Sequence, residues 1–600
     1  MQTEQALASS TKIHKTFHLM LRTTLSAISL LLPLSANADS VWQPIIDYSI
    51  SFPGDKSEAA PLIKPFENFT HFASDFGWVG AGGNRIEARG GVIHVKPDGQ
   101  SIGAWHSLAG LATQSSRLLN PADLTGLGGP KEKRAGIRKL SINASGHGSL
   151  RLELADVNRA VIWSGTVKLA SDSTTNNLLD INPAASRGLK FMNWIAEPGS
   201  GLQVSSIGFI AERPEMPIEE WMFRISLGKL RRCHDAASGF TRDRGHLPAA
   251  AFDSISSTGM QALSSALGAA EGILTKDKVS AEITTTIAAF RSLPRAAGFF
   301  PHFVARDDSG KITIHPGTEF STIDTAIALQ SLLLATDILA MSAAREEVVA
   351  MISAIDFDAV TDADGWINHG FQDDGKTPLT KSWRDWGGET ALILALEAMI
   401  PDRIPRGKMS DSGEIYGGVG FIAEIQSLFY PDFDKTEPDL ISGISWPEAR
   451  QEVLAQQQGY VITTWPDSRA ARDGIFGLSA GEAGLPGAGY TANGTNVMGI
   501  RWFHPHYMIM GLALSRPEKY AEGLRHLDAA AYLQPLGLPE NIEVELRLHN
   551  PMQSSLNAAF ETLAAYHGWR KRGSAENFLD RASMKNPLTR HAASRFYPLH

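Results

Sequence analysis

The sequence holds a single cysteine, Cys233, in 600 residues, so no disulfide can form within the chain. It also lacks an excess of positive charge, since 55 Lys and Arg stand against 64 Asp and Glu, a net charge of −9. Without a basic patch interleaved with aromatic residues, no nucleic-acid partner is expected. No nucleophile elbow, phosphate-binding loop or dinucleotide fingerprint is found at a strand–helix junction, and no cofactor is expected.

Long apolar runs are absent too, apart from a short one near the N-terminus. Leu25–Leu34 is shorter than the roughly 20 apolar residues that a membrane-spanning helix needs. It follows the basic residues Lys12, Lys15 and Arg22, and a cleavage site of the A-x-A kind, Ala36-Asn37-Ala38, comes after it. The sequence therefore predicts a signal peptide at 1–38 and no membrane span. An exported protein without disulfides suits a bacterial periplasm or exterior.

The first part of the mature chain reads as a strand-rich domain over residues 40–215. Alternating apolar and polar residues, bounded by Gly, Pro, Asn, Asp or Ser clusters, occur at Leu150–Asp156, Ala160–Leu169, Lys190–Glu197 and Val204–Glu212. This pattern predicts a jelly-roll-like β-sandwich, similar to a carbohydrate-binding module in general character only. Trp163 and Trp194 lie in alternating strands and are expected in its core, although a sugar platform remains the alternative.

Helices replace strands after Pro214 and Pro217, two residues that break any element running into them. Six strongly apolar helices are expected at about 254–270, 321–337, 388–400, 418–428, 502–515 and 552–568. Amphipathic helices are expected between them at 218–233, 276–291, 342–354, 446–457 and 516–528. The alternation of buried and half-buried helices predicts an (α/α)6 barrel at 219–575. The C-terminal tail, 576–600, has no long apolar period and is expected to pack on the surface or be loose.

The stretch Gly298–Ala335 organises the helical part. It combines an extended pair around the turn Asp307–Gly310 with a wholly apolar helix. Ser321 is a good N-cap for this helix, and Asp324 stands at the reciprocal position of a capping box. The polar chemistry of a helix buried on every side must therefore lie at its N-terminal end.

Four motifs carry a family resemblance, and they read GFFPHFV…GTEFSTIDTA, SGFTRDRGHLPAAAFDSISSTGMQAL, WRDWGGETALILALEAM and DGIFGLSAGEAGLPGAGYTANGT. Over about residues 219–575 the chain resembles the glucoamylase-like domain family, which includes endo-β-1,2-glucanases and the transglycosylase domains of cyclic β-1,2-glucan synthases. The resemblance implies the same barrel and a glycoside hydrolase or transglycosylase acting on a β-glucan or bacterial exopolysaccharide. β-1,2-Glucan is the best single substrate guess, and it rests on resemblance alone.

Glu389 is the first catalytic candidate, because hydrolysis of a glycosidic bond needs a carboxylic acid and a second carboxylate. It opens an apolar helix directly after Gly387-Gly388, which would let the backbone approach a ligand closely. The flanking Trp383, Arg384 and Trp386 are expected to stack on sugar rings and bond to them. The matching Glu of the resembled family is a catalytic candidate. The alternative is an acid favoured only by the helix dipole.

Asp324 and Glu482 are the other catalytic candidates. Asp324 matches a family acid but is equally well explained as a cap, and Glu482 lies in a loop of small residues. The related family often has an acid before Gly-Thr where this chain has Asn493, so Glu482 or Asp473 would take that role. We expect the helix ends near Ser321 and Glu389 to face one cleft, shared with the loop 473–490.

Hydrogen bonding to sugar hydroxyls is expected of the remaining polar candidates, Glu319, Arg242, His302, Tyr490, Asn493 and His506. A metal site is not expected, because His504-x-His506 has no third ligand at a fitting spacing. The partner is an oligo- or polysaccharide in each interpretation. A polysaccharide lyase using Tyr490, Asn493 and His506, or a non-catalytic glycan-binding protein, remain alternatives.

Overall fold

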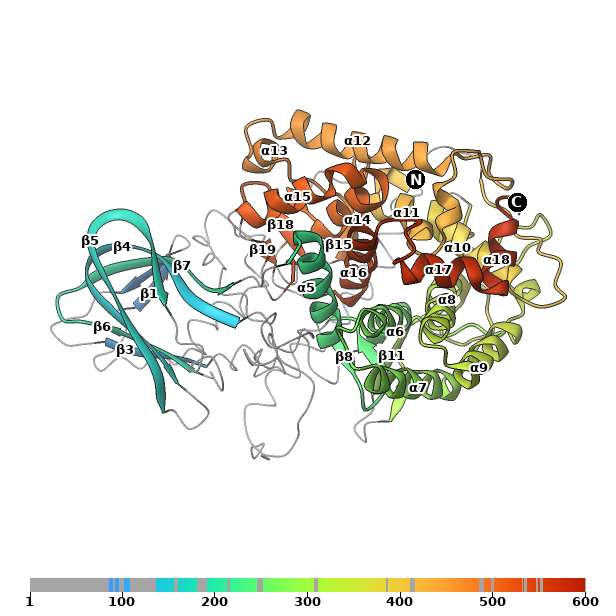
Figure 1. The fold of residues 1–600 in the computed structure, drawn as a ribbon, viewed down its shortest axis with the longest axis horizontal. Helices are drawn as coiled ribbons and strands as arrows, with labels where there is room; N and C mark the ends of the chain where they lie inside the picture. The colour runs from blue at the N-terminus through green and yellow to red at the C-terminus, as the bar shows by residue number, and fades with distance from the viewer. Residues whose placement is uncertain are drawn as a thin grey trace.

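The computed structural model describes two parts of the chain, one made of strands and one made mainly of helices (Figure 1). The described residues are 86–89, 92–95, 102–107, 136–155, 160–180, 191–212, 216–244, 252–306, 311–384, 387–410, 416–484, 490–497, 501–530, 532–533, 537–546, 549–550 and 554–598. The predicted signal peptide, the turn Asp307–Gly310 and Trp386 lie outside them.

The strand part is one antiparallel sheet with two long strands, β4 (Gly136–Ala155) and β5 (Val161–Asp180), which pair along their length. The other edge of β4 pairs first with β7 and then, from Leu150 on, with β6. The remaining neighbours follow the order β1-β2-β7-β4-β6-β3. Bounds are Ile86–Arg89 for β1, Val92–Val95 for β2, Ile102–Ser107 for β3, Phe191–Ala196 for β6 and Gly201–Glu212 for β7.

Each of the four segments predicted as strands falls on a strand of this sheet. The two-layered sandwich itself stays a prediction. Trp163 is half-buried, and its indole N–H donates to the Asp180 carbonyl at 2.9 Å. The side chain of Trp194 lies outside the description.

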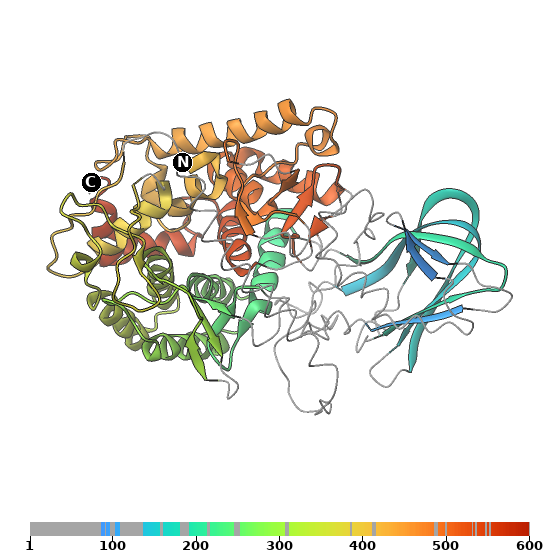
Figure 2. The same cartoon turned by 180° about the vertical axis from the view of Figure 1, so that it is seen from behind.

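The helical part has an inner ring of six helices that are buried along most of their length. They are α6 (Ile255–Ala270), α8 (Thr322–Ile338), α10 (Gly387–Ala398), α11 (Gly420–Glu424), α14 (Pro505–Ser515) and α16 (Ser555–Arg570). Each packs on the next in this order, and α16 packs on α6, so the ring closes. Figures 1 and 2 show it from opposite sides. The predicted (α/α) barrel is confirmed, with all six apolar helices close to their predicted positions.

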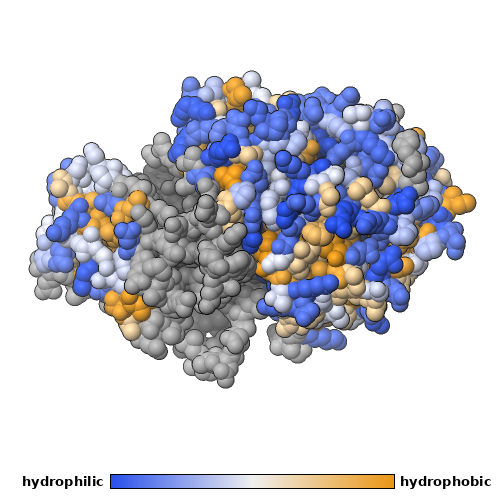
Figure 3. Space-filling view, in the orientation of Figure 1, coloured by the Kyte–Doolittle hydropathy of each residue, from blue (hydrophilic) through white to orange (hydrophobic). Residues whose placement is uncertain are grey.

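The outer helices also follow the prediction. They are α5 (Ile218–Cys233), α7 (Lys276–Ser292), α9 (Ser342–Ser353), α12 (Trp446–Thr464) and α15 (Pro517–Ala529), each packed on inner helices. Short helices connect them: η4 (Phe357–Ala359), η5 (Tyr416–Gly418), η6 (Ile425–Leu428), η7 (Pro431–Asp434) and α13 (Arg469–Asp473). Figure 3 shows a mostly hydrophilic exterior over this part, with smaller hydrophobic areas.

The C-terminal segment differs from the expectation of a superficial or loose tail. It forms α17 (Phe578–Lys585) and α18 (Pro587–Ser594), which pack on α8 and α10 where the outer ring would otherwise lack a helix. Phe596 and Tyr597 are buried, and Arg595 forms an ion pair with the buried Glu397 at 2.7 Å. Residues beyond 576 thus complete the barrel. Their apolar positions are too few and too scattered to give a long period in the sequence.

The short strands gather around the N-terminal ends of the inner helices. A five-stranded sheet contains β8 (His234–Asp235), β9 (Phe240–Arg242), β10 (Asp253–Ser254), β11 (Phe303–Arg306) and β12 (Ile312–Ile314). The others are β13 (Phe320–Ser321) with β14 (Gly370–Phe371), β15 (Ala480–Glu482) with β16 (Tyr490–Ala492), and β17 (Trp502–Phe503) with β18 (Asn541–Glu543) and β19 (His549–Asn550).

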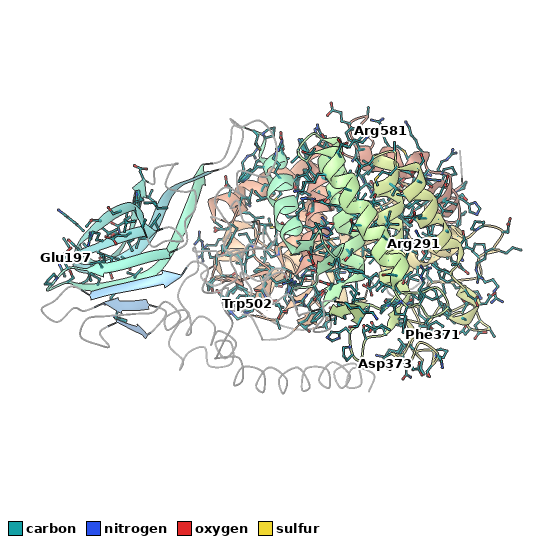
Figure 4. The ribbon with its side chains drawn as sticks, turned by 90° about the horizontal axis from the view of Figure 1, so that it is seen from below. Glu197, Arg291, Phe371, Asp373, Trp502 and Arg581 are labelled. Atoms are coloured by element: carbon teal, nitrogen blue, oxygen red, sulfur yellow. The ribbon has the colours of Figure 1, made fainter. Side chains whose placement is uncertain are left out.

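One end of the barrel therefore carries the loops that could hold a substrate. β13 leads directly into α8, and β17 ends two residues before α14. Figure 4 shows Phe371 and Trp502 on one edge of the helical part and Arg581 on the opposite edge. None of the described helices is long and apolar enough to cross a membrane.

Candidate active site

Asp324 lies in the first turn of α8 and acts as more than a cap. Its N–H donates to the Ser321 hydroxyl oxygen at 3.2 Å, which confirms Ser321 as the N-cap. Its carboxylate accepts from the same hydroxyl at 2.7 Å and from the Ser256 hydroxyl of α6 at 2.6 Å. Both predicted roles are thus open to Asp324, because the cap fixes its carboxylate at the end of the barrel.

His302 stands between two carboxylates. Its Nδ1 lies 2.8 Å from Glu319 Oε1, and its Nε2 lies 3.4 Å from Asp324 Oδ1. Burial alone would lower the pKa of His302, but the charges of Asp324 and Glu319 raise it to about 9. Burial likewise works against ionisation of Glu319, yet the His302 charge lowers the pKa of this carboxyl to about 2. At neutral pH the imidazole is therefore a cation, fixed on both sides.

Glu389 is the exception in a buried helix. Eleven of the twelve residues of α10 are buried, and Glu389, in the first turn, is half-buried. Burial raises the pKa of Glu389 to about 8, with the charge of Asp324 adding to the rise and that of His302 opposing it. The first turns of α8 and α10 therefore lie near each other, in the region of Asp324, His302 and Glu389 that is called the recess below, and Glu389 keeps its proton at neutral pH.

A second group of charges lies around β15 and β16. Arg244 Nε lies 3.3 Å from Glu482 Oε1, and its Nη1 lies 2.5 Å from Asp243 Oδ2. The guanidinium also sits over the Tyr490 ring, at 5.1 Å from its centroid. Burial raises the pKa of Tyr490 above its usual range, and nearby negative charges, that of Glu389 among them, raise it further. This group thus faces the recess that holds Glu389.

Of the aromatic residues predicted to flank Glu389, the structure describes Trp383. Trp383 is buried, its indole N–H donates to Thr322 Oγ1 at 2.8 Å, and His369 stacks on it at 4.0 Å between ring centroids. This placement makes Trp383 a core residue rather than a sugar platform. Arg384 is exposed, and its guanidinium lies 4.7 Å from the Trp366 ring centroid.

Three of the polar residues predicted to bind sugar are buried. Arg242 is 1% exposed within β9, and the side chain that reaches Glu482 belongs to Arg244, two positions on. Asn493 is fully buried, and its amide N–H donates to the Trp502 carbonyl at 3.4 Å. His506 is buried too, with Nε2 at 3.0 Å from Ser479 Oγ. These placements favour structural roles for the three.

The two glycines before Glu389 serve helix packing. A Cβ on Gly388 would lie 2.0 Å from Gln426 Oε1 and 2.8 Å from the Ile422 carbonyl, so a side chain there would collide with α11 and η6. Gly387 also approaches Ile422 and has a φ of +52°. Close packing against α11 and η6 therefore explains the two glycines, in place of the predicted close approach of a ligand. Asp473 ends α13, and its carboxylate forms an ion pair with Arg469 at 3.1 Å.

Glu540 is a buried acid that sequence analysis missed. It precedes β18, is 1% exposed, and its Oε1 accepts from Asn557 Nδ2 at 2.7 Å. Burial raises the pKa of Glu540 to about 7, although the charges of Arg244 and Lys229 lower it. Its surroundings LPEN carry no motif. Only the fold brings Glu540 beside Glu482.

His302, Glu319 and Asp324 could also offer ligand atoms to a metal ion, since one atom of each lies within 4.8 Å of the others. Each ring nitrogen of His302 lies against a carboxylate, so an ion-paired imidazolium accounts for this cluster as well. The prediction that the site uses no metal stays a prediction.

Comparison with solved structures shows the same fold in two glucanases. An endo-β-1,2-glucanase from Chitinophaga pinensis, in complex with sophorotriose and glucose, matches with a TM-score of 0.53 and 12% identity, over 63% of this chain and 97% of that chain. A β-1,2-glucanase from Parabacteroides distasonis matches with a TM-score of 0.52 and 10% identity, over 84% and 92%.

Sequence-based comparisons add nothing to this. No protein-family model matches the chain, and no curated protein is similar to it. At identities of 10–12%, the structural matches speak for the fold alone. The chain therefore has the glucoamylase-like fold, and the resemblance that its sequence motifs carry is confirmed at that level.

Proposed function

We propose that the chain is a glycoside hydrolase that cleaves a β-glucan, with Glu389 as the general acid. The observation that carries the proposal is the protonated carboxyl of Glu389, which keeps its proton to a pKa of about 8 beside the negative charge of Asp324. A glycosidase needs one protonated and one ionised carboxyl group at the bond that breaks. Two proteins of the same fold are β-1,2-glucanases by name, which supports the substrate class.

The proton of Glu389 would pass to the glycosidic oxygen as the bond to the anomeric carbon breaks. A second carboxylate would take a proton from the attacking water or attack the carbon itself. Glu482 suits this role better than Asp324. The carboxylate of Asp324 is occupied by two hydroxyls and His302, whereas among the described residues only Arg244 donates to Glu482, through Oε1. Asp324 would then stabilise developing positive charge at the sugar ring.

The cations of the recess argue against a uronate-specific lyase. A lyase must neutralise the substrate carboxylate with a free cation or amide. Here Arg244 is paired with Asp243 and Glu482, and His302 with Glu319 and Asp324. Asn493 and His506, which the lyase alternative would use, are buried. A recess with this charge balance suits a neutral glycan.

The substrate we propose is β-1,2-glucan, met outside the cytoplasm after removal of residues 1–38. Transglycosylation is the variant of the same chemistry in which a sugar hydroxyl replaces water. Residues 40–215 would form a sandwich that binds glycan beside the barrel. The long strand β4 supports this architecture, because its first half pairs with β7 and its second half with β6.

Incubation with a panel of glycans tests the proposal. Residues 39–600 are incubated with β-1,2-glucan, other β-glucans and a uronate polymer, and products are analysed by mass. Shorter glucans with intact reducing ends are expected from β-1,2-glucan. Unsaturated products that absorb in the ultraviolet would establish a lyase. Tight binding to one of these glycans, with no product from any of them, would establish a non-catalytic glycan-binding protein instead.

A further inference from the structure

One edge of β15, the strand that carries Glu482, is hydrogen-bonded by side chains from other segments of the chain. β15 pairs with β16 on the other edge, in the register Ala480↔Ala492 to Glu482↔Tyr490. The carbonyl of Glu482 accepts from Asn541 Nδ2 and lies 3.1 Å from His504 Nε2. The side chains therefore stand where a third strand would otherwise supply hydrogen bonds to the backbone.

Glu540 completes this edge from the N–H side. The N–H of Glu482 donates to Glu540 Oε1 at 3.4 Å, and the same oxygen accepts from Asn557 Nδ2, which also donates to the Ala480 carbonyl at 3.2 Å. A Cβ on Gly481 would lie 2.9 Å from Glu540 Oε1, so the missing side chain lets the carboxylate reach the strand. Glu540 Oε2 is buried and has no hydrogen-bond partner among the described residues.

We propose that Glu540 is a positioning residue that fixes the backbone of Glu482 and thereby holds the Glu482 carboxylate against Arg244. The proposal rests on the proposed function, in which Glu482 is the second carboxylate. Glu540 is 1% exposed and its carboxylate accepts from the N–H of Glu482, so it acts through Glu482. Displacing a reacting group by about 1 Å can lower the rate roughly 10²-fold.

Glu424 offers a matched control for a buried acid without this role. It is fully buried, and burial raises the pKa of its carboxyl to about 7, as it does for Glu540. Glu424 accepts from Ser515 at 2.9 Å, and Ser515 is the last residue of α14. His504, which lies against the Glu482 carbonyl, directly precedes the first residue of the same helix. The eleven residues of α14 thus lie between the two sites, a distance of about 16 Å at the rise of an α-helix.

Three variants separate positioning from stability. In E540A the Glu482 N–H loses its acceptor, and kcat on β-1,2-glucan is expected to fall roughly 10²-fold with KM near the wild-type value. E540Q keeps an oxygen acceptor for both N–H groups and is expected to recover most of the rate. E424A loses thermal stability but keeps its kcat. Hydrogen exchange is measured in parallel, and the amides of Ala480–Glu482 are expected to exchange faster in E540A alone.

Two results would overturn the proposal. One is an E540A protein with the kcat of E424A, and the other is unchanged exchange of the β15 amides in E540A. The exchange experiment needs no substrate, so it decides the point even where no glycan is turned over. Faster exchange in E540A together with a wild-type protein inactive on every glycan would count against the proposed function and leave the anchoring of Glu482 in place.

Discussion

Glu389→Gln is expected to remove activity and to stabilise the protein at the same time. Gln keeps the size and hydrogen bonding of the side chain but has no transferable proton. A general acid contributes roughly 10²–10⁴-fold to the rate, so kcat should fall by at least that factor while glycan affinity changes little. An acid that only favours the helix dipole would cost about 0.3–1 kcal/mol of stability and leave the rate nearly intact.

The stability gain follows from the raised pKa of Glu389, about 8 in the folded protein against an ordinary 4.5. Below pH 4.5 both folded and unfolded chains hold the proton. As pH rises above 4.5, Glu389 ionises in the unfolded chain first. The free energy of unfolding then falls by about 1.4 kcal/mol per pH unit. At pH 7 this penalty amounts to about 3 kcal/mol and vanishes near pH 4. Glu389→Gln removes it.

Urea unfolding of both proteins at pH 4 and pH 7 measures this difference, and kcat is measured on the same preparations. The variant should match the wild type at pH 4 and exceed it at pH 7. Asp324→Asn is the informative second variant, because loss of the Asp324 charge lowers the Glu389 pKa and should shrink the pH 7 penalty of the wild-type residue. A Glu389→Gln protein with near-normal turnover, or a stability difference that does not depend on pH, would refute the reasoning.

The remaining predictions concern other parts of the barrel. The kcat of the wild type should decline above pH 8 as Glu389 loses its proton, and a rate that stays level to pH 10 speaks against Glu389 as the acid. His302→Gln removes the cation that lowers the pKa of Glu389, so the alkaline limb of the pH–rate profile should move to higher pH. An alkaline limb at the wild-type pH would disprove the interaction between His302 and Glu389. Trp383→Ala should cost about 3–5 kcal/mol of unfolding free energy, as a core residue does, whereas weaker glycan binding at unchanged stability would restore the sugar-platform role. A chain ending at residue 576 should not fold, and a cooperative thermal transition in it would contradict the place of α17 and α18 in the outer ring.

The fold was predictable because its signal is periodic and local. Each apolar helix of the inner ring is continuous in sequence, and the N-cap at Ser321 marks the start of α8 by a hydrogen bond within one turn. The last outer helices were missed for the opposite reason. α17 and α18 have eight residues each and gain their stability from contacts such as Arg595 with Glu397, nearly 200 positions away.

The site was predictable only in part, because a motif indicates which residues are special without showing what they contact. Glu389 and Asp324 were found from their positions in the first turns of apolar helices, a local feature. The role of Gly388 was misjudged, since its neighbour is α11 and not a ligand. Glu540 and Arg244 act on Glu482 across sequence separations of 58 and 238 residues, and no pattern records such pairs.

The most direct test of the central claim is mass analysis of the products formed from β-1,2-glucan in water labelled with oxygen-18. A glycoside hydrolase adds the oxygen of one water to the anomeric carbon of each broken bond, so every fragment with a newly formed reducing end should carry a single label, and Glu389→Gln should form almost none. Shorter products with no labelled reducing end among them would mean transfer to a sugar or elimination in place of hydrolysis. Labelled products formed at the wild-type rate by Glu389→Gln would contradict the assignment of the acid on which the account rests.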